Sequence, residues 1–240
     1  MRKYPVKSML GTELPSALVT ERGLQGDRER AVLDVATGKI ASAKNPRLWR
    51  DLLTLDGSRP PGDEELSKLL GREVRLIDTV PDEVEFERSI PEEVLAQGIE
   101  AEVGYTMSHG MAGSFLDFAP IHVVTTATLD WLGMDAVRYR PNLVIDTPDR
   151  EYGWPGRTLR IGAEVELEVM VATPRCAIPT LAHGDLPRDT DALRLPARHN
   201  RIEVYDLGPQ PCVGVYARVS RAGTVRTGDP AELLPPRAGS

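Results

Sequence analysis

The chain has 240 residues, of which 41% are hydrophobic and 27% are charged, and its formal net charge is -7. This mixture is typical of soluble globular proteins and excludes disorder throughout the chain. The acidic balance argues against nucleic-acid binding, which needs a basic surface, but it still allows a local basic pocket for a small anion. No run approaches the roughly 18 apolar residues of a membrane span, and no apolar signal-peptide core follows the first residues. We therefore expect a cytoplasmic protein that contacts no membrane.

Short elements separated by Gly and Pro run along the whole sequence, which predicts a mainly β (α+β) fold with a few short helices. The first two predicted strands flank Ala36-Thr37-Gly38 and are expected to form a hairpin. The clearest strand covers 164–171, where Val165, Leu167 and Val169 alternate with Glu166 and Glu168. Strands rich in Val, Ile, Leu or Thr are predicted at 31–35, 39–43, 74–77, 121–125, 143–146, 164–171 and 213–219.

Four short helices are predicted from caps and stop signals. Asp63 is expected to cap a helix through residue 70 that Gly71 ends, and Thr126 to cap one at 127–132. Pro91 is expected to open a helix through residue 97, and a further helix at 189–198 is expected to be broken by Pro196. The acidic segment 80–93 is the best candidate for a connection between two β-rich halves.

Cys176 is the strongest candidate for chemistry. It follows the clearest strand in Thr173-Pro174-Arg175-Cys176, and the prolines at 174 and 179 predict a rigid loop. The neighbouring Arg175 favours a thiolate, which is the nucleophile and the ligand for soft metals. The alternative is that Cys176 is a small buried apolar residue, the usual state of a free cysteine.

The other cysteine and the histidines carry weaker signals. Cys212 opens an apolar strand and is interpreted as structural. Two cysteines exclude a disulfide framework, and the spacing of the four histidines makes an all-protein zinc site unexpected. His122 lies in a predicted strand and is expected to be packed. His183 follows Cys176 by seven residues, so it is either the partner of a Cys–His pair or, as we expect, a solvated loop residue.

Basic residues beside Gly or Pro turns suggest an anion site, because an anion needs a point charge, a guanidinium and free backbone N–H groups. Such residues occur in Lys7-Ser8, Gly26-Asp27-Arg28 and Arg140-Pro141-Asn142. Each is weak alone, since surface Lys and Arg are usually just solvated. No P-loop, GxGxxG or GxSxG motif is present.

In combination these motifs resemble MOSC proteins, a family named after the C-terminal part of molybdenum cofactor sulfurase. Tyr4-Pro5-Val6-Lys7-Ser8, Gly26-Asp27-Arg28 and Pro46-Arg47-Leu48 are similar to the N-terminal β-barrel region of the family. Arg140-Pro141-Asn142, Arg175-Cys176 and Gly228-Asp229-Pro230 are similar to the MOSC domain itself. The resemblance implies an N-terminal β-rich domain over 1–90 and a β-barrel MOSC domain over 91–240.

Several members of this family, including amidoxime-reducing enzymes, bind a molybdopterin cofactor whose molybdenum has a protein cysteine as ligand. The resemblance therefore implies that Cys176 is the metal ligand and the catalytic residue. It also implies cofactor contacts for residues in both predicted domains, namely Lys7, Ser8, Arg28, Arg140, Asn142, Pro174 and Arg175. The residues themselves agree, since molybdenum accepts a thiolate and the pterin phosphate accepts bonds from Lys and Arg.

The sequence departs from the family pattern on the expected substrate side. Arg30 stands where an aromatic residue is often found, Ser42-Ala43-Lys44 replaces Thr-x-Arg, and 180–185 replaces a Thr-Val-Asp-Pro run. We expect an oxidoreductase that reduces N-oxygenated small molecules with electrons from a separate donor protein. The alternatives are a sulfur carrier with a persulfide on Cys176 and a cofactor-binding module without turnover.

Overall fold

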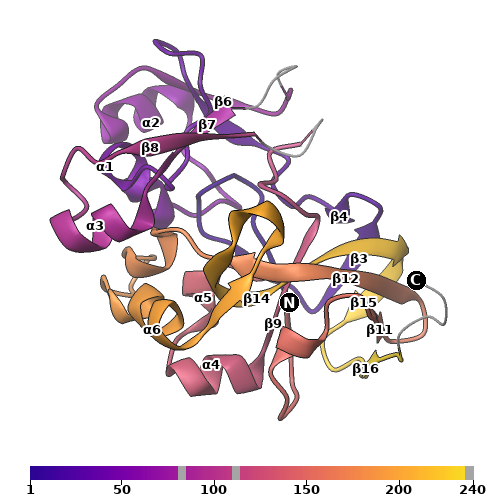
Figure 1. Cartoon of the computed structure of the whole chain (residues 1–240). Helices are drawn as coiled ribbons and strands as arrows, with labels where there is room; N and C mark the ends of the chain where they lie inside the picture. The colour runs from indigo at the N-terminus through magenta and orange to yellow at the C-terminus, as the bar shows by residue number, and fades with distance from the viewer. Residues whose placement is uncertain (81–84, 110–113, 236–240) are drawn as a thin grey trace.

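The computed structural model describes residues 1–80, 85–109 and 114–235, and its fold is mainly β, with 35% strand and 24% helix (Figure 1). The prediction of a mainly β protein is confirmed. Its largest sheet is a nearly closed barrel whose hydrogen-bonded order is β10, β9, β14, β12, β11 and β16, with β13 added to β14. The bounds of these strands are β9 Ile121–Thr125, β10 Leu143–Ile145, β11 Thr158–Ile161, β12 Val165–Pro174, β13 Arg201–Glu203, β14 Pro209–Arg221 and β16 Ala231–Leu233.

Strand β12 shows why this sheet forms where the alternation predicts it. Val165, Leu167 and Val169 are buried in the barrel core, whereas the glutamates between them face outward. Burying one face of each strand in this way fixes the register, because a slip of one residue would expose the whole apolar set. The predicted strand at 164–171 extends in the structure to Pro174, which places the end of the strand two residues before Cys176.

The N-terminal strands complete the barrel together with a strand from the other end of the chain. Strand β3 (Ser16–Thr20) pairs with both β4 (Gly23–Leu24) and β15 (Gly223–Arg226), and its Ala17 and Val19 side chains join the barrel core. Gly23 is required at this junction, since it has φ +100° and a Cβ there would lie 2.5 Å from the carbonyl oxygen of Pro120. A small ladder of β1 (Arg2–Lys3) and β2 (Thr12–Glu13) lies beside these strands.

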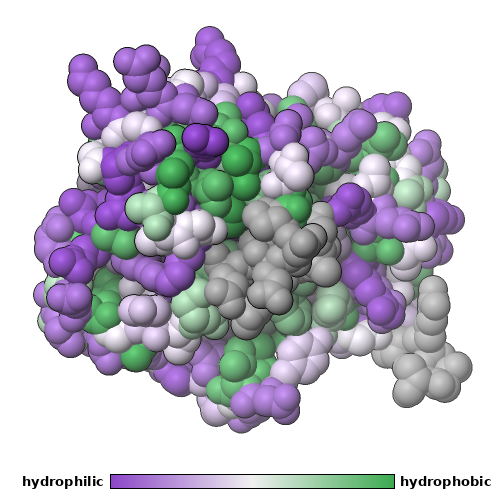
Figure 2. Space-filling view, turned by 90° about the horizontal axis from the view of Figure 1, so that it is seen from above, coloured by the Kyte–Doolittle hydropathy of each residue, from purple (hydrophilic) through white to green (hydrophobic). Residues whose placement is uncertain are grey.

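A second lobe, at the top of Figure 1, contains two β-ladders and short helices around its own core. Strand β5 (Ala31–Asp34) pairs with β6 (Val74–Ile77), and β7 (Glu85–Ser89) pairs with β8 (Tyr105–His109). The helices of this lobe are α1 Pro46–Trp49, the 3-10 helix Arg50–Thr54, α2 Asp63–Leu70 and α3 Pro91–Gln97. Seen from above in Figure 2, the rim of the molecule is mostly hydrophilic and hydrophobic residues gather nearer its centre.

The predicted helices exist, with corrections at their ends. The N-cap of α2 is Gly62, and the carboxylate of Asp63 instead accepts a hydrogen bond from the Leu76 backbone N–H at 2.8 Å. Helix α4 (Thr126–Leu132) is capped by Thr125, one residue earlier than predicted. Helix α6 (Asp191–His199) continues through Pro196 without a break. A short helix that was not predicted, α5 (Ala136–Tyr139), ends at Arg140.

The predicted hairpin at 31–43 is wrong in its second strand. The chain does turn back after Gly38, but the returning segment makes only an isolated bridge between Leu33 and Ile40. The full ladder of β5 is formed with the distant β6. The proposed connection at 80–93 contains β7 and the start of α3, and its residues 81–84 lie outside the described residues. The domain boundary between residues 90 and 91 stays a prediction.

Candidate functional site

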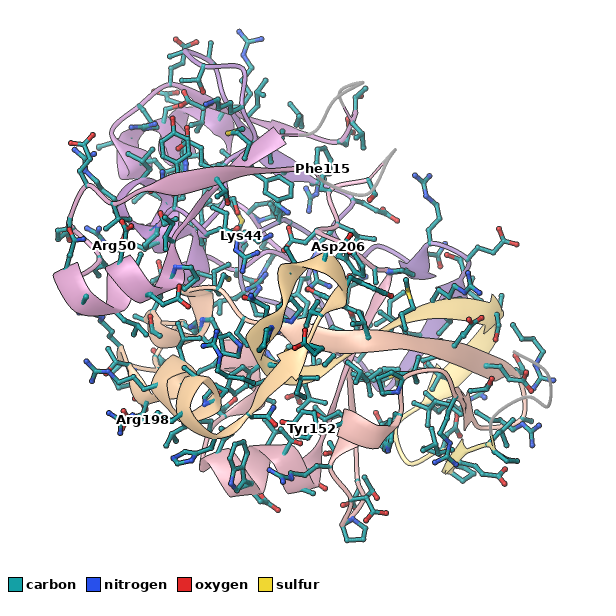
Figure 3. The ribbon with its side chains drawn as sticks, in the orientation of Figure 1. Lys44, Arg50, Phe115, Tyr152, Arg198 and Asp206 are labelled. Atoms are coloured by element: carbon teal, nitrogen blue, oxygen red, sulfur yellow. The ribbon has the colours of Figure 1, made fainter. Side chains whose placement is uncertain are left out.

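A cavity of about 460 Å³ lies where the upper lobe meets the open side of the barrel. Figure 3 shows three of its lining residues, Lys44, Phe115 and Asp206, close together in this region. The cavity is also lined by all eight residues selected from the sequence, namely Lys7, Ser8, Arg28, Arg140, Asn142, Pro174, Arg175 and Cys176. The structure therefore brings both predicted halves of the site together, while the role of each residue stays a prediction.

The backbone of this cavity is strained at specific points. Among the described residues, four non-glycine residues have a left-handed backbone: Ser8 (φ 65°), Arg28 (φ 48°), Arg140 (φ 57°) and Tyr205 (φ 42°). All four line the cavity. A non-glycine residue in this region costs about 1–3 kcal/mol and persists only where the surroundings fix it, which happens mostly at functional sites. The strained residues therefore make this cavity the candidate functional site.

Cys176 lies on the wall of the cavity, with 8% of its surface exposed. It follows the last residue of β12, Pro174, which pairs with Cys212 on β14. The backbone N–H of Arg175 still donates to the Pro211 carbonyl at 2.8 Å, so the chain leaves the sheet at Cys176. Cys212 itself is fully buried, and burial raises the pKa of its thiol to about 11. Cys176 also packs in an apolar cluster with Leu53 and Ile178, so its role as a reactive thiol stays a prediction.

Arg138 holds the segment that follows Cys176. Its guanidinium is buried and donates to three backbone carbonyls, those of Pro179 (3.4 Å), Leu181 (3.2 Å) and Pro187 (2.7 Å). Carbonyls bonded in this way cannot turn toward solvent without leaving a buried charge unpaired. Arg138 was not identified from the sequence, because nothing local to it indicates that its partners lie some 40 residues away.

Arg140 and Arg175 are buried cations with unused hydrogen-bonding capacity. In the described part of the chain, Nη1 of Arg140 and Nε of Arg175 have no hydrogen-bond partner, and neither side chain has an ion pair. Arg175 does donate from Nη2 to the Tyr139 carbonyl at 3.1 Å. Burial lowers the pKa of Arg140 to about 10. A buried guanidinium without an ion pair is costly, so these two residues are candidates for binding an anion.

Arg28, by contrast, already has its counter-charge. It forms an ion pair with the buried Asp27, and it donates to the side-chain oxygen of Asn142 and to the Arg140 carbonyl, each at 3.3 Å. Asn142 Oδ1 also accepts from the His122 backbone N–H at 3.1 Å. The guanidinium carbons of Arg28 and Arg140 lie 4.5 and 4.4 Å from the centre of the Tyr4 ring. Arg28 and Asn142 therefore tie the N-terminal segment to the barrel.

Two lysines share one carboxylate on another wall of the cavity. Lys7 forms an ion pair with Asp117, and Lys44 reaches the second oxygen of Asp117 at 3.1 Å. Burial, only partly offset by Asp117, lowers the pKa of Lys7 to about 8. Burial raises the pKa of Asp117, but the two lysines outweigh this effect and hold it well below its usual range. Since two cations face one anion, this wall keeps a net positive charge.

Histidines near the site are neutral and packed. His122 is buried, and burial together with Arg175 holds its pKa well below the usual range. The prediction that His183 is a solvated loop residue is wrong: it is 1% exposed, and its Nδ1 lies 3.0 Å from the Leu181 carbonyl oxygen. Burial lowers its pKa to about 4. No hydrogen bond between His183 and Cys176 is found within the described residues, so a Cys–His nucleophile pair has no support.

Several lining residues were not identified from the sequence. Lys44 was noted only as a departure from the family pattern, and Asp117 has no local motif. The aromatic residues Phe118, Tyr205 and Tyr216 also line the cavity. Only tertiary contacts reveal them: the ring centres of Phe118 and Tyr216 lie 5.3 Å apart, and those of Phe118 and Tyr205 lie 6.2 Å apart.

Comparison with known families agrees with this geometry. Residues 112–232 match the MOSC domain, and residues 1–61 match the MOSC N-terminal beta barrel domain. This chain belongs to the MOSC family. The resemblance seen in the sequence motifs is thereby confirmed, and the cavity is formed by residues of both matched regions.

The curated relatives of this MOSC protein include mitochondrial amidoxime reducing component 2. The protein from Macaca fascicularis is 25% identical over 95% of this chain and 80% of its own length. The one from Homo sapiens is 31% identical over 52% of this chain and 40% of its own length. Among solved structures, YiiM from Geobacillus stearothermophilus aligns over 67% of this chain and 76% of its own at 15% identity and a TM-score of 0.34, too low to support an argument. In the described part of the chain, no helix has the length and apolarity needed to cross a membrane.

Proposed function

We propose that the cavity binds a molybdenum–molybdopterin cofactor with Cys176 as the metal ligand, and that the protein is an oxidoreductase acting on N-oxygenated small molecules. The observation that carries the proposal is the presence of a cysteine thiol in the same cavity as two buried guanidiniums with unpaired N–H groups. A thiolate is a suitable ligand for a soft metal, and guanidiniums are suitable for a phosphate. The names of the two curated relatives add the reduction of amidoximes.

The residues of this chain divide the work of binding. Arg140 and Arg175 would hold the anionic end of the cofactor, because each has a buried N–H group without a hydrogen-bond partner. Lys7 and Lys44 would supply positive potential from the opposite lobe, shared with Asp117. Pro174 and the Arg138 contacts hold the Cys176 segment in one position, as a metal ligand requires. When bound, the cofactor supplies two-electron redox chemistry.

The electrons for the proposed reaction must come from an external donor. Reduction of an N–OH group to N–H consumes two electrons and two protons and releases one water, and no group of this chain can supply the electrons. We therefore propose a separate electron-donor protein as partner and a small molecule as substrate. The location in the cytoplasm stays a prediction from the sequence.

The test begins with metal analysis of protein purified from a molybdenum-replete host. Wild type and Cys212→Ser are expected to contain molybdenum and to oxidise reduced viologen in the presence of an N-hydroxylated compound, whereas Cys176→Ser should lose both properties. Cys212 is a matched control because it is the second cysteine and lies beside Pro174 on the neighbouring strand. Absence of molybdenum, together with an extra sulfur on Cys176 by mass spectrometry, would instead indicate the sulfur carrier. Bound molybdenum without turnover would indicate the cofactor-binding module.

A further inference from the structure

The cavity has an aromatic wall that the cofactor site described above does not use. Phe118 and Tyr205 line the cavity and are 45% and 61% exposed, and Leu207 beside them is 58% exposed. Exposed apolar side chains that gather at one place mark binding surfaces rather than folding requirements. Here they are continuous with the cavity that contains Cys176.

The turn that presents Tyr205 is firmly built. It lies between β13 and β14 and rises toward the upper lobe in Figure 1. Val204 at its base is buried, and two backbone bonds close the turn, from Val204 to Gly208 (3.2 Å) and from Leu207 to Val204 (2.9 Å). Gln210 adds a side-chain bond to the Leu207 carbonyl at 2.8 Å. The exposed ring of Tyr205 therefore lies on a turn that these hydrogen bonds hold in place.

Tyr205 is held at a cost to the fold. Its φ of 42° is the left-handed conformation that a bulky residue rarely adopts, and asparagine or glycine would adopt it more easily. Its side chain is mostly in solvent, so burial does not offset this strain. The other three residues with this backbone conformation, Ser8, Arg28 and Arg140, line the same cavity. A strained, exposed aromatic residue at this place indicates selection for a ligand contact.

We propose that Phe118 and Tyr205 are specificity-determining residues that bind a planar aromatic group of the substrate. This inference rests on the proposed reductase function and adds the part of the substrate distant from the reacting N–O bond. Phe118 lies between Tyr205 and Tyr216 in a chain of tilted rings, with centre-to-centre distances of 6.2 and 5.3 Å. The rings are tilted by 38° and 36°, and the exposure of Phe118 and Tyr205 leaves them accessible to an additional stacked or edge-on ring.

The test compares two amidoximes that share the reacting group, benzamidoxime with a phenyl ring and acetamidoxime with a methyl group. Tyr205→Asn should lower the benzamidoxime-to-acetamidoxime ratio of kcat/KM about two- to tenfold, the range that one aromatic ring pair contributes. Tyr205→Phe should keep the wild-type ratio, and Phe118→Ala should lower it. The matched control is Tyr105→Asn, since Tyr105 is 55% exposed on β8 and does not line the cavity.

Two further measurements separate this inference from its rivals. Tyr205→Asn should unfold at the same denaturant concentration as wild type or a higher one. If Tyr205 instead stabilised the fold, its replacement would lower the unfolding midpoint. Saturation-transfer NMR without an electron donor should show contact with the phenyl protons in wild type and in Tyr105→Asn, and loss of contact in Tyr205→Asn.

Equal loss of kcat/KM for both amidoximes in Tyr205→Asn, or no phenyl contact in the wild-type protein, would overturn the proposal that Phe118 and Tyr205 bind an aromatic group. Failure of wild type to reduce either compound would overturn the reductase function instead, and the NMR experiment would then still decide whether the rings bind an aromatic group.

Discussion

Replacing Arg140 with methionine removes a buried positive charge while keeping most of the side-chain volume. Burial lowers the pKa of this guanidinium to about 10, well below its ordinary value, which corresponds to a cost of about 3 kcal/mol at ~1.4 kcal/mol per pH unit. Because the folded pKa is below the unfolded pKa, the cost is present at every pH below about 10 and is lost only as the pH rises toward the unfolded value. It therefore acts in full at neutral pH.

The gain from removing this charge is reduced by the loss of the contact with the Tyr4 ring at 4.4 Å, worth about 0.5–2 kcal/mol. We expect cofactor-free Arg140→Met to be about 1–2 kcal/mol more stable than wild type in denaturant unfolding at pH 7. Inorganic phosphate should stabilise the wild-type protein by mass action and have little effect on the variant. The functional residue would then be one that the fold tolerates at a cost.

The contrasting variant is Arg28→Met in the same cavity. It should lose about 3–5 kcal/mol of stability, because Asp27 is left buried without its partner. If Arg140→Met is destabilised to the same degree, or if phosphate stabilises it as much as it stabilises wild type, then Arg140 has a counter-charge that the structure does not show and the reasoning is refuted.

Three other outcomes are expected. Cys176 should be alkylated much more slowly in cofactor-loaded protein than in cofactor-free protein, as measured by mass spectrometry, because a metal-bound thiolate is occupied; equal rates would contradict its role as ligand. Arg138→Ala should lower the free energy of unfolding by several kcal/mol, on the order of 1–3 kcal/mol for each carbonyl left unpaired. It should also speed alkylation of cofactor-free Cys176. An unchanged alkylation rate would show that the loop keeps its position without Arg138. Phosphate affinity, measured by titration calorimetry, should weaken as the pH rises through about 8, where Lys7 loses its charge. The Lys7→Met variant should bind phosphate more weakly and with less dependence on pH. If the midpoint of the pH dependence is the same in the variant, another group titrates.

The sequence predicts the candidate site better than it predicts the strands. All eight residues that the family resemblance implied line one cavity, because the motifs that carry the resemblance are short local features that the sequence displays directly. The strand at 164–171 was recognisable because its apolar and acidic residues alternate. Strand β3 was missed because Leu18 is apolar yet 45% exposed, which hides the alternation of Ala17 and Val19.

What could not be predicted depends on distant partners. The segment at 39–43 has strand-forming residues but makes only one bridge to β5, whereas β5 forms its full ladder with β6 about 40 residues away, which local propensity does not reveal. His183 was expected to be solvated because it lies in a predicted loop beside Gly184, whereas Arg138 holds this loop against the protein. The sequence does not single out Tyr205, because the features that do so are its backbone φ angle and its contact with Phe118, which exist only in the folded protein.

The pairing of β15 with β3 sets the order of events during synthesis. Gly223 pairs in register with Val19, so the edge of β3 that contacts β15 stays unpaired until the ribosome has added about two hundred more residues. At the usual ~5–20 residues per second this delay is roughly 10–40 s. Lys7 and Arg28 emerge early, while Arg140 and Cys176 emerge only in the second half of translation. The last residue that lines the cavity is Tyr216, so the cavity can receive a cofactor only late in synthesis, after β14 has emerged.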